Sequence, residues 1–176
     1  LLDVASGISY LHSMDPPIVH GDIRGLVASQ GNILVADDLH CCIADFGLSL
    51  IAADSQSWTI TVTSTLKGSM RWMAPELFHH DGSLDLHLNH PSRDVYAFGC
   101  TMLEILTLQL PFYERKTDYM VFAALMAGER PVRPNGVWFP DEIWNLTTSC
   151  WAQEATARPK AREVYNVLHE FIQAAE

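Results

Sequence analysis

The chain of 176 residues has the length of one folded domain, and its 48% of hydrophobic residues favours a globular protein over a disordered one. Its net charge of −10 argues against a nucleic-acid-binding surface, because phosphate backbones are bound by clustered Lys and Arg. No apolar run approaches a membrane span and the first residues lack the features of a signal peptide, so we expect a cytoplasmic protein with neither a membrane nor a nucleic-acid partner.

The first predicted element is a helix over residues 1–11, whose apolar positions recur at helical spacing. The prolines that follow it would prevent its continuation. Two short apolar runs, 32–35 and 41–44, predict strands joined by the turn-forming residues 36–38. These strands would form a small hairpin that carries Asn32 at one end and Asp45 at the other.

Polar residues stand beside the apolar runs of this region. Asp22 follows Ile18-Val19, Asn32 precedes the first hairpin strand, and Asp45 follows the second. A loop anchored by buried strands can hold a carboxylate near a substrate hydroxyl, while a carboxylate and an amide oxygen can bind a hard cation such as Mg²⁺. Mg²⁺ usually takes one or two protein carboxylates together with phosphate oxygens. This set of groups therefore suits phosphoryl transfer.

Two polar stretches follow. Residues 48–67 are rich in Ser and Thr and predict a long exposed loop. Residues 79–91 contain four histidines and two aspartates, but they lack the spacing of known metal motifs, so we interpret them as a solvated loop rather than a metal site.

The rest of the chain predicts helices over residues 92 to about 110, 119–127, 141–151 and 161–174. The cysteines are Cys41, Cys42, Cys100 and Cys150. They show no C-x-x-C spacing, and we interpret them as small buried thiols of a reducing compartment rather than as disulfide or zinc ligands.

Four signatures occur in a fixed order: His20-Gly21-Asp22, Asn32, Asp45-Phe46-Gly47 and Ala74-Pro75-Glu76. This order resembles the H-R-D, Asn, D-F-G and A-P-E motifs of eukaryotic protein kinases. The resemblance implies a mainly α fold, the kinase-like C-terminal lobe, as a helical bundle with a small β-hairpin at the catalytic and metal loops. Residues 1–176 would form a partial kinase domain without its N-terminal lobe, with the catalytic loop at 18–35 and the activation segment at 45–76.

The resemblance also implies roles for single residues. Asp22 would orient the substrate hydroxyl and accept its proton, and Arg24 would stabilise the transferring phosphoryl group. Asn32 and Asp45 would hold the Mg²⁺ bound to ATP. The expected function is transfer of the ATP γ-phosphoryl group to Ser or Thr of a protein substrate, with Tyr left open. Arg24, Ser69 and the similarity of 68–76 to the tyrosine kinase-like group favour Ser and Thr.

Three departures from the family keep an alternative open. Gly21 replaces the family's Arg, and nine residues instead of four separate Asp22 from Asn32, the excess lying at Leu26–Gln30. This insertion could bulge outward, or it could pull Asn32 away from the metal. Nothing precedes Leu1, so the isolated chain is expected to be inactive without a small lobe. The alternative is a pseudokinase or lobe fragment that acts as a protein-binding module.

Two further expectations concern support of the site. Asp94, in a sequence similar to the family's central helix, would brace the backbone of the catalytic loop, or cap its own helix, or do both. Glu76 and Arg158 would form a buried ion pair with a structural rather than a catalytic role.

Overall fold

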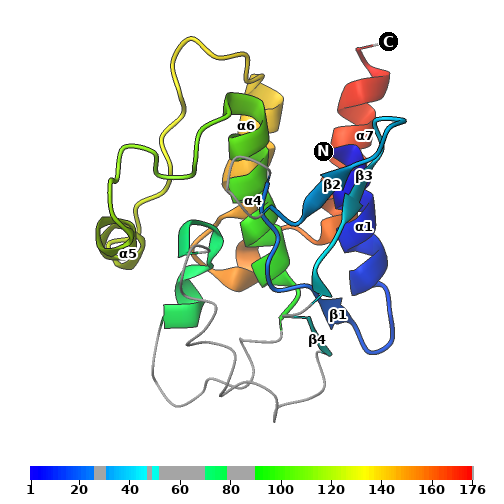
Figure 1. The fold of residues 1–176 in the computed structure, drawn as a ribbon, viewed down its shortest axis with the longest axis horizontal. Helices are drawn as coiled ribbons and strands as arrows, with labels where there is room; N and C mark the ends of the chain where they lie inside the picture. Colours follow the sequence, from blue (N-terminus) through cyan, green and yellow to red (C-terminus); the bar gives the residue numbers. More distant parts are fainter. Residues whose placement is uncertain (26–30, 47–48, 52–69, 79–89, 176) are drawn as a thin grey trace.

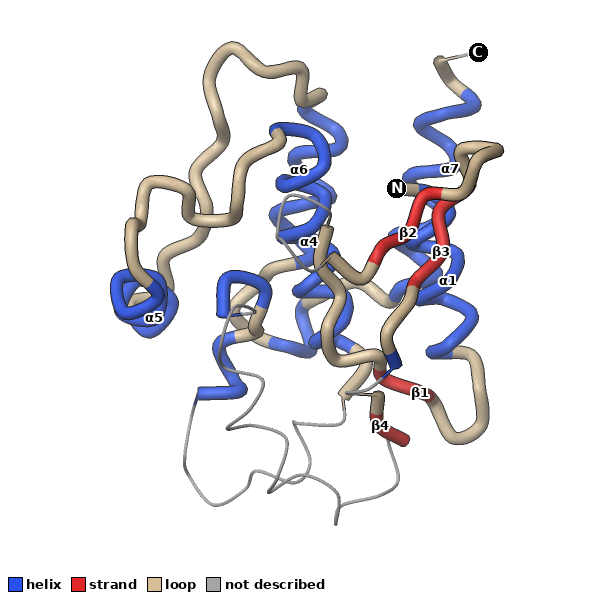
Figure 2. Tube along the Cα trace, in the orientation of Figure 1, coloured by secondary structure: helices blue, strands red, loops and turns tan. Residues whose placement is uncertain are grey.

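The computed structural model describes residues 1–25, 31–46, 49–51, 70–78 and 90–175 (Figures 1 and 2). Its α-helices are α1 (Leu2–His12), α4 (Ser92–Thr107), α5 (Asp118–Met126), α6 (Asp141–Cys150) and α7 (Ala161–Gln173). Short 3-10 helices are η2 (Met70–Trp72), η3 (Pro75–Phe78) and η4 (Ala155–Ala157). The strands are β1 (Ile18–Val19), β2 (Ile33–Val35), β3 (Cys41–Ile43) and β4 (Leu50–Ile51).

Helix α4 forms the centre of the molecule. Every residue from Ser92 to Glu104 is buried, as expected of a helix that is covered by other elements on all sides. Figure 1 shows α4 between the pair α1 and α7 on one side and α5 on the other. The mainly helical fold is therefore confirmed, and α4 is the element against which the loops of the site are placed.

The predicted hairpin is confirmed, with one correction. Strands β2 and β3 are antiparallel, and Ile33 pairs with Ile43. The N–H of Ala44 donates to the carbonyl of Asn32 at 2.8 Å. Asn32 and Asp45 therefore lie at the same open end of the hairpin, and the prediction that they stand at opposite ends was wrong. An antiparallel register brings the start of one strand to the end of the next.

The predicted exposed loop at 48–67 is wrong at its start. Leu50 and Ile51 form β4, which pairs antiparallel with β1 through Ile18 and Val19. Pairing satisfies backbone groups that a two-residue apolar strand would otherwise leave without partners. The remainder of the predicted loop, 52–67, lies outside the described residues.

The helix ends agree with prediction to within a residue or two, except at α4. This helix stops at Thr107 because Leu108 adopts a left-handed conformation, with φ of 55°, and donates its N–H to the carbonyl of Glu104. Within the part of the chain that the structure describes, no helix is long and apolar enough to cross a membrane.

The cysteines are free, and the prediction that they are buried holds only in part. Cys100 and Cys150 are buried, Cys41 is half-buried, and Cys42 is exposed. Successive side chains of a strand point to opposite faces, and only one face of the hairpin packs on the molecule, so Cys42 points to solvent.

Candidate active site

The loop around Asp22 is held by a carboxylate of α4. Asp94 accepts the N–H of His20 on Oδ2 and the N–H of Gly21 on Oδ1, both at 2.8 Å. Gly21 has φ of +83°, a left-handed conformation that glycine adopts without strain. His12 of α1 donates from Nε2 to the same Asp94 Oδ2 at 3.0 Å. One side chain thus ties α1, α4 and the predicted catalytic loop together.

These contacts confirm that Asp94 braces the loop. Burial acts to raise the pKa of Asp94, but the hydrogen bonds from His12 and from the amides of Gly21 and His20 outweigh it and hold that pKa below its usual value. The compatible capping role is not present as a hydrogen bond, because α4 has no side-chain cap hydrogen bond, although Asp94 lies in its first turn. The oxygens of Asp94 point back to the loop instead of to the helix amides.

Asn32 lies beside Asp22 although the sequence between them is longer than in the family. Its Nδ2 donates to the backbone oxygen and to Oδ2 of Asp22, both at 2.8 Å. The N–H of Asn32 also donates to the carbonyl of Arg24 at 3.1 Å, which closes the chain across the insertion. The residues 26–30 themselves lie outside the described part. Asn32 therefore lies within hydrogen-bond distance of Asp22, and its place at a metal ion stays a prediction.

Arg24 contacts the same carboxylate oxygen. Its Nη2 lies 3.0 Å from Asp22 Oδ2, and both side chains are largely buried. Among the described residues, the buried Nε of Arg24 has no hydrogen-bond partner. Because Arg24 and Asn32 both donate to Oδ2, they fix the rotation of the Asp22 carboxylate. Three of the four predicted site residues are thus brought together.

The fourth, Asp45, stands at the open end of the hairpin. It is exposed and has φ of 61°, which is uncommon for a residue other than glycine. Its neighbour Phe46 packs edge-on against the ring of His20, with centroids 5.0 Å apart. His20 donates from Nε2 to the carbonyl of Ala44 at 3.1 Å, so the loop of Asp22 and the loop of Asp45 are joined through one histidine. Gly47 and Ser69 lie outside the described residues.

Glu104 supports the loop from the middle of α4, and sequence reasoning missed it. Its Oε2 accepts the N–H of Gly25 at 2.8 Å and the indole N–H of Trp72 at 3.1 Å. A Cβ added at Gly25 would stand 2.6 Å from this oxygen, so a larger residue would force the Glu104 carboxylate to shift. The available signal was a lone carboxylate within a strongly apolar helical stretch, since such a group is buried only when it is hydrogen-bonded.

Arg93, which precedes Asp94, was also missed. Its Nη2 donates to the carbonyl of Gly21 at 3.4 Å. Burial lowers the pKa of Arg93, while the carboxylates of Asp94, Glu76 and Asp22 act in the opposite direction. The N–H of Gly21 is therefore held by Asp94, and its carbonyl by Arg93. The sequence signal was a charged pair at the start of an apolar helix.

The predicted ion pair between Glu76 and Arg158 is present. Two nitrogens of Arg158 donate to the two oxygens of Glu76, each at 2.7 Å. The guanidinium also donates to the carbonyl of Ala152 at 2.9 Å and lies over the ring of Tyr96, 5.0 Å from its centroid. Paired donors of this geometry match a carboxylate well. The pair fastens η3 to the start of α4 and to η4.

Segment 70–78 is anchored on its other side by Arg71. Its guanidinium donates to three backbone carbonyls, those of Pro111, Phe112 and Arg115, each at 2.8 Å. Together with the Trp72 bond to Glu104, this fixes the segment between α4 and the connection that leads to α5.

Comparisons with known proteins agree with this geometry. The family model of protein tyrosine and serine/threonine kinases matches residues 1–168. The chain is 35% identical over 175 residues to the dual specificity protein kinase shkC of Dictyostelium discoideum, and the match covers 98% of the chain and 32% of that kinase. It is 30% identical over 173 residues to the serine/threonine-protein kinase CTR1 of Arabidopsis thaliana, which covers 98% of the chain and 19% of that kinase. The chain thus spans less than half of the length of these relatives.

Proposed function

This chain belongs to the protein tyrosine and serine/threonine kinase family, and we propose that it is the C-terminal lobe of a kinase that phosphorylates Ser or Thr of protein substrates. The observation that carries the proposal is the arrangement at Asp22, whose Oδ2 accepts from both Asn32 and Arg24. Asp94 fixes the backbone on which Asp22 stands. The proposed domain is 1–176, with the catalytic loop at 18–35 and the activation segment at 45–76.

In this proposal Asp22 is the group that orients the substrate hydroxyl and takes its proton. A general base must lie within hydrogen-bond reach of that proton and must not turn away from it. The two donors on Oδ2 hold the carboxylate in one rotation, so the lone pairs of Oδ1 have a defined direction. Arg24, whose Nη2 lies 3.0 Å from Asp22 Oδ2, would stand beside the reacting position, and its positive charge would stabilise the transferring phosphoryl group.

Asn32 and Asp45 are proposed to hold Mg²⁺ with ATP. The donor set fits this ion, which prefers carboxylate and carbonyl oxygens. The Nδ2 of Asn32 donates to two oxygens of Asp22, so its amide orientation is fixed and its carbonyl oxygen points away from that residue. The hairpin register places Asp45 at the same open end. When bound, the metal would neutralise charge on the phosphates of ATP, while these two residues keep it in position.

Calorimetry with ATP and Mg²⁺ on the 176-residue chain tests the nucleotide half of the proposal. We expect binding that requires Mg²⁺ and is lost in Asp45→Ala. Asp37→Ala removes the same charge from the exposed hairpin turn and is the matched control. Equal binding by both variants would remove Asp45 from the metal site.

Peptide phosphorylation by the chain joined to the small lobe of a related kinase tests the catalytic half. Replacement of Asp22 by Asn keeps the shape of the side chain but removes its basicity, and we expect turnover to be abolished while ATP still binds. Ser, Thr and Tyr versions of one peptide would report the acceptor. Unchanged turnover in the Asn variant would refute the role of Asp22.

A binding module without catalysis is the second candidate, and Gly21 is the observation that favours it. The family's Arg at this position receives the phosphate of the activation segment, and glycine cannot. A chain that captures a protein partner but fails both tests above would establish this alternative.

A further inference from the structure

A cavity lies away from the proposed active site. Its volume is about 830 Å³, and its walls come from α1, the start of α4, η4 and the start of α7. None of the four proposed site residues lines it. Cavities of about 300–1,000 Å³ are typical of small-molecule sites in proteins. The size alone therefore permits a ligand larger than a few waters.

The charge of this cavity is opposite to that of the chain. Among the described residues that line it there is no Asp or Glu, although the chain carries 21 acidic residues against 11 basic ones. Three of the basic residues line it: Arg158, Lys160 and Arg162. Arg158 is neutralised by Glu76. Of the ion pairs between described residues, none involves the side chain of Lys160 or Arg162.

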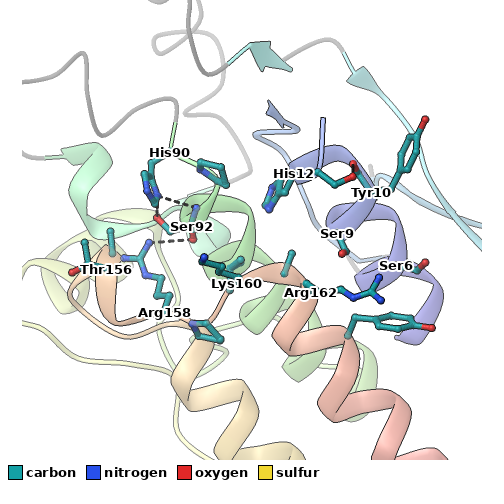
Figure 3. Close-up of a pocket in the computed structure, with 17 residues that line it drawn as sticks. Ser6, Ser9, Tyr10, His12, His90, Ser92, Thr156, Arg158, Lys160 and Arg162 are labelled. Carbon is teal, nitrogen blue, oxygen red and sulfur yellow. Dashed lines mark hydrogen bonds between the residues drawn. The ribbon is translucent and has the colours of Figure 1, made fainter. Parts of the chain in front are cut away.

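The other walls are aromatic, apolar or hydroxylic. Figure 3 shows Ser6, Ser9 and Arg162 on one side of the cavity, with Thr156 and Arg158 on the other and Lys160 between them. The guanidinium of Arg162 lies 5.5 Å from the centroid of Tyr165, which also lines the cavity. Two cations thus stand next to an aromatic surface and to small hydroxyl donors, and no Asp or Glu is among the described lining residues.

We propose that this cavity is a binding site for a small organic anion with an aromatic body. A phosphate or carboxylate group would contact Lys160 and Arg162, since charged donors bind such groups more strongly than neutral ones do. The ring would lie against Tyr165 and the apolar wall. This site is separate from the proposed nucleotide site, and binding to it does not depend on kinase activity.

Occupancy of the cavity would be transmitted to the loop of Asp22. His12 lines the cavity and donates to Asp94 Oδ2 at 3.0 Å. Asp94 in turn accepts the N–H groups of His20 and Gly21. Two successive hydrogen bonds therefore connect the cavity wall to the catalytic loop, and a ligand that fixes the ring of His12 would stabilise those two amides.

The test is calorimetry on the 176-residue chain with 2-naphthyl phosphate, 2-naphthoate and the neutral 2-naphthol. We expect both anions to bind at least about tenfold more tightly than the alcohol, because each charged hydrogen bond contributes about that factor. The phosphate and the carboxylate arms distinguish the two sources of anion. Binding of the alcohol as tight as that of both anions would overturn the proposal.

Three variants locate the binding. Arg162→Gln should weaken binding of the anions about tenfold. Lys116→Gln removes an exposed charge outside the cavity and should leave their affinity unchanged. Ser9→Phe keeps every charge but fills the space, and it should abolish binding. Equal affinities in Arg162→Gln and Lys116→Gln, or full binding by Ser9→Phe, would place the anion elsewhere. Hydrogen exchange of the His20 and Gly21 amides should slow on binding, and unchanged exchange would refute the transmission through His12.

Discussion

The two sides of the proposed active site are built differently. The Asp22 side stands on α4, through Asp94, which is 1% exposed, and Glu104, which is 0% exposed. The Asp45 side stands at the end of a two-stranded hairpin, where Phe46 is 51% and Leu34 55% exposed. The first side is therefore preorganised by buried hydrogen bonds. The second has an open face, on which the proposed metal ligand Asp45 stands exposed.

The largest loss of stability is expected when the ion pair that supports the Asp22 side is broken. Glu76→Ala leaves the buried guanidinium of Arg158 without its partner, and removing one member of a buried pair typically costs about 3–5 kcal/mol. Urea unfolding monitored by circular dichroism measures this loss.

The matched control is Glu129→Ala, which breaks the exposed pair with Arg115. Exposed ion pairs contribute about 0–1 kcal/mol, so the unfolding midpoint should barely move. If both variants lost the same stability, the pair of Glu76 and Arg158 would have no special structural role.

A smaller loss is expected at the contact between the loop and the middle of α4. Gly25→Ala forces a Cβ against Glu104 and should destabilise by about 1–3 kcal/mol. The indole N–H resonance of Trp72 should also shift, because the same carboxylate oxygen accepts it. Proton NMR and urea unfolding report the two effects.

Gly136→Ala is the control for backbone strain alone. Gly136 has φ of +75°, and an added Cβ would meet no atom within 4 Å. Its cost should be about 1–2 kcal/mol with the Trp72 resonance unmoved. A Trp72 resonance that stays in place in Gly25→Ala would contradict the contact.

Local pattern predicted much of this structure, and long-range pairing explains what it missed. The helices and the hairpin could be predicted from apolar periodicity. The choice of Asp22, Asn32 and Asp45 as candidate site residues rested on their places beside apolar runs. The partners of Glu104 could not be predicted, because Gly25 and Trp72 are 79 and 32 residues away in sequence. The pairing of β4 was missed for the same reason: two residues show no period, and only their partner β1 defines them as a strand.

The loss of stability at acid pH should depend in part on protonation of Asp94. Its pKa is lower in the folded state than the unfolded value of about 3.9. The carboxylate therefore contributes stability that is fully present above the unfolded value and is lost as pH falls through the folded value. In Asp94→Asn the fall in stability on acidification should be shallower than in the parent.

Urea midpoints between about pH 3 and 6 measure this slope. Asp37→Asn, in the exposed hairpin turn, removes the same charge and should retain the slope of the parent. An identical acid slope in the parent and in Asp94→Asn would mean that the bonds to His20 and Gly21 do not favour the ionised form.

The smallest expected effect is a difference in thiol reactivity, not in stability, between the two regions. Cys42 is exposed on the hairpin, whereas Cys100 and Cys150 are buried where α4 and α6 pack. Burial raises the pKa of Cys150 to about 12, and a thiol in that state is a poor nucleophile. Iodoacetamide followed by mass spectrometry should label Cys42 in the native protein and the two helical cysteines only after unfolding. Native labelling of Cys150 at the rate of Cys42 would mean that the helical core opens as readily as the hairpin face, and the contrast between the two regions would fail.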